Sequence, residues 1–126
     1  MTSIFRTGMR VAFAASLLAA PSLPASAAGA LAIGACGAYG QTYGFPAVAA
    51  AEKRALEQCE GQGCRIVARL RRNCAALAVD AANPCGAHGS GTASRLGRAQ
   101  NDALRQCYRD GGKDCVIRTF VCDGKS

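Results

Sequence analysis

The sequence has a single histidine, His88, among its 126 residues. A catalytic set that needs an imidazole, such as Cys-His or Ser-His-Asp, would have to be built around this residue, and no such order surrounds it. His88 takes the place that Tyr39 holds in the internal repeat described below, and a position shared with tyrosine is better explained by packing. One imidazole also adds little to a zinc site. We therefore predict no catalytic residue, no bound metal and no cofactor.

The eight cysteines form no Cys-x-x-Cys motif, which argues against a redox pair and against a zinc knuckle. Large apolar side chains are also few after the first 27 residues, so the core needs help from covalent links. An even number of cysteines in a small exported chain is typical of a disulfide framework. We predict that all eight form disulfides: Cys36, Cys59, Cys64, Cys74, Cys85, Cys107, Cys115 and Cys122.

No apolar run after residue 27 approaches the ~20 residues that cross a bilayer, so no membrane span is predicted. Residues 1–27 have the three regions of a secretory leader: Arg6 and Arg10, an apolar run at 11–20, and Ala25-Ser26-Ala27 as the cleavage site. A lipoprotein is the alternative, because residues 33–36 loosely resemble a lipobox, but a stretch with two prolines separates them from the apolar run. The leader predicts an exported protein, periplasmic or extracellular.

The rest of the chain is organised by an internal repeat. Ala55-Leu56-Glu57-Gln58-Cys59 returns as Ala103-Leu104-Arg105-Gln106-Cys107, and Cys-Gly-Ala-aromatic-Gly precedes each copy. The apolar patterns predict strands at 29–34 and 76–80, strands at 36–43 and 85–91, helices at 46–59 and about 96–107, and strands at 64–70 and 115–122.

The predicted fold class is therefore α+β. Two tandem strand-strand-helix-strand repeats, at about 29–74 and 75–122, are expected to form one pseudo-twofold, disulfide-stapled domain over residues 28–126. The helices are expected to pack on an antiparallel sheet. A repeat this short cannot bury its own apolar face, so the two halves should be parts of one unit.

The repeat also predicts how the cysteines pair. In each copy, the cysteine at the helix end and the cysteine of the next strand are brought together by a glycine turn. The other four cysteines form two repeat-equivalent pairs, and equivalent residues meet near a pseudo-twofold axis. We therefore predict the pairs Cys59–Cys64, Cys107–Cys115, Cys74–Cys122 and Cys36–Cys85.

Several of these motifs together resemble a known family. They are Gly29-Ala30-Leu31-Ala32-Ile33, the doubled Ala-Leu-x-x-Cys, the doubled Gly-x-x-Cys, and Asn73-Cys74-Ala75-Ala76-Leu77-Ala78. The chain resembles the secreted bacterial family called Domain of Unknown Function 4189 over essentially its whole length after the leader. The resemblance implies export and a bacterial source, and it carries no general activity and no catalytic residues. Cys36 and Cys85 are additions to the six cysteines that the family pattern implies.

Four arginines lie in the segment 64–74: Arg65, Arg69, Arg71 and Arg72. If this segment is a strand, its period of two places Arg65, Val67, Arg69 and Arg71 on one face. The chain after the leader has a formal charge of +5, so a cationic stripe could bind an anionic envelope polymer or an acidic protein. The alternative is a solvated strand face whose charge discourages aggregation. Sequence-specific nucleic-acid binding is not predicted, because no aromatic residues alternate with the basic ones.

Two functions remain open at this point. One is a non-enzymatic binding module of the bacterial envelope or exterior, which includes an inhibitor of a hydrolase. The other is a small secreted hydrolase that uses acidic residues such as Asp80, Asp102 and Asp110, although their spacing does not force them together. The sequence makes no prediction about oligomeric state.

The leader predicts cleavage after Ala27. Mass spectrometry of the periplasmic or secreted protein should find Ala28 as the first residue, because Ala25-Ser26-Ala27 has the small residues that the cleavage site needs. A retained leader, or a lipid attached to an N-terminal Cys36, would contradict this prediction.

Overall fold

The structure, a computed structural model, describes residues 27–124 and residue 12, so the predicted leader lies almost wholly outside the described residues. The elements follow as β1 (Ala28–Ile33), a 3-10 turn (Ala35–Gly37), β2 (Tyr39–Phe45), α1 (Val48–Gln58), β3 (Arg65–Leu70), β4 (Cys74–Asp80), β5 (His88–Ala93), α2 (Leu96–Arg109) and β6 (Cys115–Cys122). The predicted α+β class and the doubled strand-strand-helix-strand order are confirmed. Residues 36–38 and 85–87, which were expected in strands, instead form turns.

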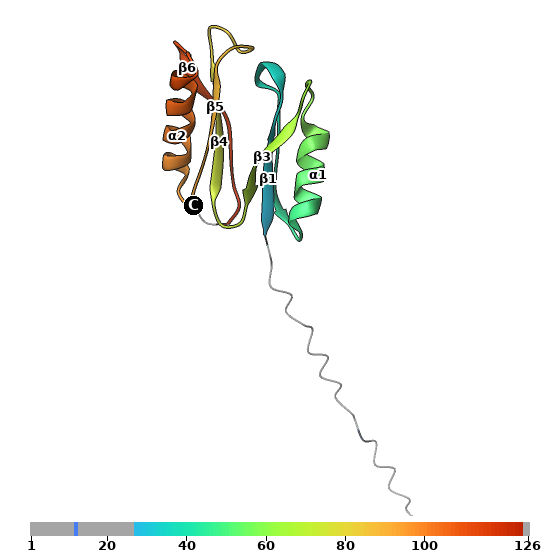
Figure 1. Ribbon diagram of the computed structural model, residues 1–126. Coiled ribbons are helices and arrows are strands. Elements are labelled where there is room, and N and C mark those ends of the chain that lie inside the picture. Colours follow the sequence, from blue (N-terminus) through green and yellow to red (C-terminus); the bar gives the residue numbers. More distant parts are fainter. Residues whose placement is uncertain (1–11, 13–26, 125–126) are drawn as a thin grey trace, which may run out of the picture.

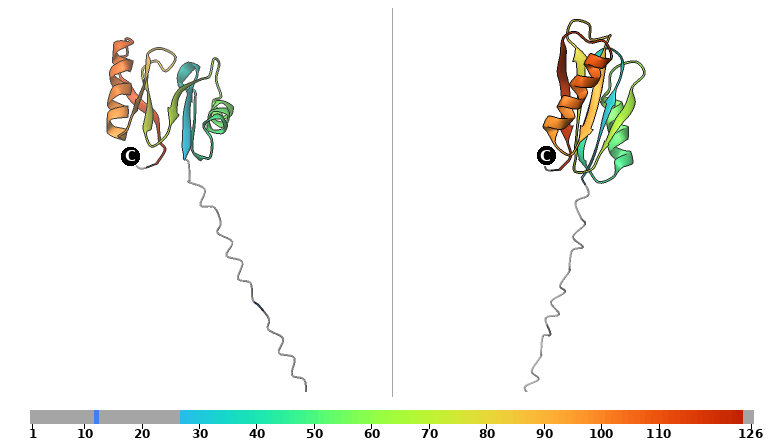
Figure 2. Two further views of the ribbon diagram at one scale, coloured as in Figure 1. Left: turned by 60° about the horizontal axis from the view of Figure 1, so that its bottom comes forward. Right: turned by 60° about the vertical axis from the view of Figure 1, so that its left-hand side comes forward.

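The strands form two sheets of three, in the orders β2-β1-β3 and β5-β4-β6, and every pairing is antiparallel. Figure 1 shows the two sheets face to face, with α1 and α2 on the outer faces. The views in Figure 2 show the same four layers of helix, sheet, sheet and helix. The antiparallel sheet expected from the sequence is thus divided in two, one sheet to each repeat.

The central strands explain this division, because β1 and β4 are buried on both faces. Small residues face the helices, and larger residues face the opposite sheet. Alternation with a period of two is what separates the two sets. The core between the sheets therefore consists of Leu31, Ile33, Ala68, Leu70, Ala75, Leu77, Val79 and Val121.

Glycine and alanine let each helix approach its sheet closely. A Cβ added to Gly40 of β2 would overlap the carbonyl oxygen of Ala55 in α1, and one added to Gly89 of β5 would overlap that of Ala103 in α2. The two contacts are equivalent in the two repeats. They show that backbone packs directly on backbone at both helix-sheet interfaces.

Each repeat has a β-bulge at the same place in its last strand. Leu31 pairs with Ala68 and Ala32 pairs with Ile66, so Val67 is the extra residue in β3. In β6 the extra residue is Arg118, which lies between the partners of Leu77 and Ala78. A bulge shifts the register by one residue and reverses which side chains face the core.

The four disulfides are the pairs expected from the repeat, namely Cys36–Cys85, Cys59–Cys64, Cys74–Cys122 and Cys107–Cys115. Cys36 and Cys85 lie in equivalent turns, and their bond joins the two halves. The reason given for Cys74–Cys122 is wrong, however. Cys74 is the first residue of β4 and the register partner of Cys122, so this bond links neighbouring strands of one sheet.

The close approach of α2 to β5 predicts opposite effects of one substitution at two glycines. Gly89→Ala should destabilise the protein by about 1–3 kcal/mol, because the new methyl group overlaps the α2 backbone. Gly97→Ala, in the same helix but with no atom within 4 Å of the added Cβ, should stabilise it by about 0.5–1 kcal/mol. Thermal or denaturant unfolding of the oxidised variants measures both effects. Equal changes at the two positions would show that the helix does not pack as described.

Candidate functional site

The four arginines predicted to form one stripe are separated in the structure. Arg65 pairs with Ile33 and so lies on the face toward the other sheet, whereas Arg69 pairs with Ala30 and lies on the face toward α1. The bulge at Val67 is the cause, because it reverses the alternation between the two arginines. The predicted stripe of Arg65, Val67, Arg69 and Arg71 on one face is therefore wrong.

The other members of this group also differ in their surroundings. Arg69 donates from its Nε to the carboxylate of Glu52 on α1, so its charge is neutralised locally. Arg71 and Arg72 lie exposed in the turn between β3 and β4, and neither has an ion pair among the described residues. Arg72 has a φ of 57°, in the left-handed region. The turn holds two adjacent, uncompensated charges that project into solvent.

The acidic residues considered for a hydrolase are used for backbone contacts. The Asp80 carboxylate accepts hydrogen bonds from the backbone N–H groups of Ala82, Lys113 and Asp114, at 3.0 to 3.3 Å. The hydrogen bond from Ala82 is the main cause that lowers the pKa of Asp80 below its ordinary value of 3.8, with the Lys113 and Asp114 N–H groups and the Lys113 charge acting in the same direction. Asp80 is therefore an anion at neutral pH, which does not suit a general acid.

The other two carboxylates have surroundings that differ from those of Asp80. Asp110 accepts the backbone N–H of His88 at 3.2 Å. Asp102 lies on α2 eight residues earlier, which is about 12 Å along a helix. The structure thus gives these three residues separate places, and two of them have clear structural roles.

A hollow lies between the two sheets on the side where β3 faces β5. Its inner part, of about 260 Å³, is lined by Ile33, Leu77 and Val79, with the Cys36–Cys85 disulfide at one end. Its outer part, of about 540 Å³, extends to Ser90, Gln106, Arg109 and Asp110. Ile33, Arg65 and His88 line both parts, so the two adjoin each other. We call this hollow the β3–β5 groove.

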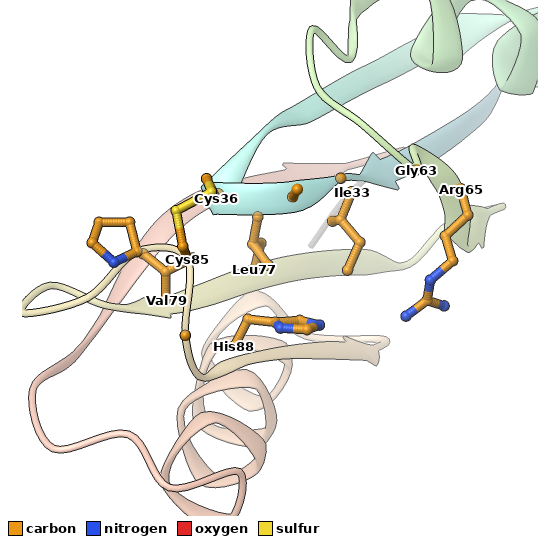
Figure 3. A pocket seen from close by; sticks show the side chains of 13 residues that line it. Ile33, Cys36, Gly63, Arg65, Leu77, Val79, Cys85 and His88 are labelled. Carbon is orange, nitrogen blue, oxygen red and sulfur yellow. A yellow bond between two sulfur atoms is a disulfide. The ribbon is translucent and has the colours of Figure 1, made fainter.

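The β3–β5 groove combines an apolar floor with a charged mouth. Figure 3 shows Ile33 and Leu77 directed into the space between the sheets, the Arg65 guanidinium at the end away from the disulfide, and the His88 imidazole between the two. Arg109 and Asp110 add a second guanidinium and a carboxylate from the end of α2. Two guanidinium groups therefore stand against one carboxylate, and that carboxylate already accepts a hydrogen bond.

Sequence reasoning named two charged lining residues of this groove as candidates, Arg65 for binding and Asp110 for a hydrolase, and it placed Cys36 and Cys85 in a disulfide. It explained His88 by packing, and this is wrong because the His88 side chain is exposed at the groove mouth. Arg109 was not singled out. One signal was available in the repeat itself, since Arg118 of the second copy stands where the first copy has Val67.

Fold, disulfides and surface together define a small disulfide-rich α+β protein built on a duplicated unit. The chain belongs to the family described as Domain of unknown function (DUF4189), which matches residues 28–122. It is also similar to a solved structure described as the NMR structure of Rv1813c from Mycobacterium tuberculosis, with 27% sequence identity and a TM-score of 0.57. That likeness covers 82% of this chain and 80% of the other. No curated protein matches the chain significantly.

Two further observations concern only the part of the chain that the structure describes. None of its helices is both long enough and apolar enough to cross a membrane. Within the same residues, no three His, Cys, Asp or Glu side chains gather as a possible metal site. The four disulfides are typical of a protein that folds in an oxidising compartment.

The lowered pKa of Asp80 predicts a pH-dependent loss of stability in Asp80→Asn. A carboxyl group whose pKa is lower in the folded state stabilises the fold fully above its unfolded pKa of about 4, and this contribution is lost as the pH falls through the folded pKa. Asp80→Asn should therefore melt below the parent at pH 7. The difference should shrink as the pH is lowered from about 4 to 2.

Asp102→Asn is the control, since it removes the same charge from a residue of α2. Its melting temperature should differ from that of the parent by less than that of Asp80→Asn at pH 7. An offset for Asp80→Asn that stays constant from pH 7 to pH 2 would contradict the role given to its carboxylate.

Proposed function

We propose that this protein is an exported, non-enzymatic binding module that acts on an anionic partner of the cell envelope or exterior. The observation that carries this proposal is that the acidic and the basic side chains have different surroundings. Three of the eight acidic side chains, those of Asp80, Asp110 and Asp123, accept hydrogen bonds from backbone N–H groups, and Glu52 and Glu57 are in ion pairs. The basic side chains remain at the surface, and the only ion pairs among the described residues are Arg54–Glu57 and Arg69–Glu52.

This distribution gives the exterior a more positive potential than the net charge alone suggests. Asp80 and Asp123 are buried, so their charges contribute less to the surface field than a guanidinium that extends into solvent, whereas Asp110 is exposed. Arg71 and Arg72 illustrate this, because they are adjacent, exposed and uncompensated at the end of β3. A surface of this kind attracts polyanions and acidic proteins over a distance of about one Debye length.

The stapled scaffold also suits binding outside the cytoplasm. Each half has a disulfide from its helix end to the next strand, and Cys36–Cys85 joins the halves, so the surface is held rigid. A rigid surface loses little conformational entropy when it binds. The partner that these features favour is an anionic envelope polymer or an acidic protein, and a hydrolase inhibited by this surface would be one such protein.

Retention on a heparin column tests the proposal. The double variant Arg71→Ser with Arg72→Asn should elute at lower salt than the parent, because two uncompensated charges are lost. Asparagine is chosen at position 72 because it tolerates the left-handed backbone found there. Melting curves should show that the variant remains folded, since both side chains are exposed.

Arg69→Ser is the matched control for this experiment. Its charge is already paired with Glu52, so its removal should change the elution salt less than the loss of an unpaired arginine. If the double variant elutes at the same salt as the parent, the exposed arginines are a solvated surface and the proposed anionic partner loses its support.

A further inference from the structure

The two edges of the interface between the sheets are equivalent positions in the repeat. On one edge β2 lies against β6, and on the other β5 lies opposite β3. The pairing registers give the equivalent residues. Ile33 pairs with Tyr39 as Val79 pairs with His88, so Tyr39 corresponds to His88. The two bulges match Arg118 to Val67, and the partners of Leu31 and Leu77 match Ala68 to Thr119.

At the β2–β6 edge, two residues of β6, Arg118 and Thr119, make contacts that cross from one sheet to the other. Arg118 donates from its Nε to the carbonyl oxygen of Gly37 at 3.3 Å, and its guanidinium carbon lies 5.5 Å from the centre of the Tyr39 ring. The Thr119 hydroxyl donates to Oε1 of Gln41 at 2.8 Å. A cation over an aromatic ring and a buried hydroxyl with its partner both stabilise such an edge.

The β3–β5 edge lacks the equivalents of these contacts among the residues that the structure describes. Valine at position 67 cannot reach across as Arg118 does, and His88 replaces the tyrosine ring. Ala68 has no hydroxyl where Thr119 has one, and Ser90 takes the place of Gln41. The β2–β6 edge therefore has side-chain contacts of this kind between the two sheets, and the β3–β5 edge, within the described residues, does not.

The hollows on the two edges reflect this difference. Arg118 also lines two further hollows, of about 410 and 250 Å³, and its side chain occupies the space beside Tyr39. On the β3–β5 edge, Val67 stands in the place of Arg118, and the two parts of the groove adjoin at Ile33, Arg65 and His88. The groove therefore reaches the edge of the apolar core, where Ile33, Leu77 and Val79 each expose 5% or less of their surface.

We propose that the β3–β5 groove binds a small amphiphilic monoanion, with its acidic group at Arg65 and Arg109 and its apolar part over Ile33, Leu77 and Val79. Guanidinium groups bind carboxylate and phosphate oxygens in a bidentate manner, and an apolar cleft with a few polar groups is the usual form of a small-molecule site. Asp110 at the mouth disfavours a ligand with two or more negative charges. The site goes beyond the polyanion surface proposed above, because Arg71 and Arg72 lie at the opposite end of β3.

A chemical-shift titration of the oxidised protein tests this site with defined probes. Hexanoate and dibutyl phosphate are monoanions with apolar chains, and their comparison distinguishes a carboxylate ligand from a phosphodiester. Hexanol has a similar chain without the charge. We expect hexanoate, dibutyl phosphate or both to shift the amides of Arg65, His88 and Ser90, and hexanol to bind about tenfold more weakly or not at all.

Two variants locate the binding in the groove. Arg65→Gln should weaken the bound monoanion about tenfold, whereas Arg98→Gln, which removes the same charge from an exposed position of α2, should leave it unchanged. Val67→Arg combined with His88→Tyr places the residue types of Arg118 and Tyr39 at the equivalent positions of the β3–β5 groove. This double variant should lose binding at least about tenfold while its melting curve stays cooperative.

Several results would overturn the proposal. If hexanol binds as tightly as hexanoate, the arginines do not contribute to binding. Chemical-shift changes confined to residues outside the groove would place the ligand elsewhere. Equal effects of Arg65→Gln and Arg98→Gln would show that only net charge matters. If the double variant Val67→Arg with His88→Tyr does not fold, the comparison of Arg65→Gln with Arg98→Gln decides the question.

Discussion

The packing of one three-stranded sheet against the other is the interaction on which the rest of the structure depends. Each sheet has a helix on one face only, and its second face would be exposed without the other repeat. A small sheet with one exposed apolar face is not stable alone in water. The repeat must therefore occur twice, and β1 and β4 must alternate small residues toward the helix with larger ones toward the other sheet.

The two repeats agree where backbone packs on backbone and differ where the sheets meet at their edges. Gly40 and Gly89 admit the same helix contact, and Gln58 and Gln106 both accept an edge-strand N–H, from Gln41 and Ser90. These positions tolerate little change because any added atom would separate the layers. The edges impose no such restriction. Arg118 makes a contact between the sheets at one edge, and the equivalent Val67 makes none of this kind with the described residues at the other, while the shared scaffold is the same.

The sequence alone was sufficient for the elements and their repeat. Alternation in Ala30-Leu31-Ala32-Ile33 and the Ala-Leu-x-x-Cys stripe are local patterns, so they predict strand and helix directly. The disulfide pairs followed from the repeat, but Cys74 shows how a correct pair can have another cause. It is the register partner of Cys122 in one sheet, and strand register depends on tertiary pairing.

The candidate site depended on features that no local pattern contains. A bulge at Val67 leaves no mark in the residue types, yet it places Arg65 and Arg69 on opposite faces. The groove requires Arg65 of β3, His88 of β5 and Arg109 of α2 to meet, and their meeting depends on how the sheets face each other. Comparing the repeats position by position, with the bulges in register, is the step that would have indicated the difference between Arg118 and Val67.

Amide hydrogen exchange of the oxidised protein tests most directly whether the two sheets form one cooperative unit. It also tests whether the contacts between the sheets at the β2–β6 edge make that edge more stable than the β3–β5 edge. The account predicts that buried amides of β1 and β4 exchange with the same free energy of opening, because neither sheet survives without the other. It also predicts that amides of β3 and β5 exchange faster than their repeat equivalents in β6 and β2. Different opening free energies for β1 and β4, or equal protection of the two edges, would contradict it.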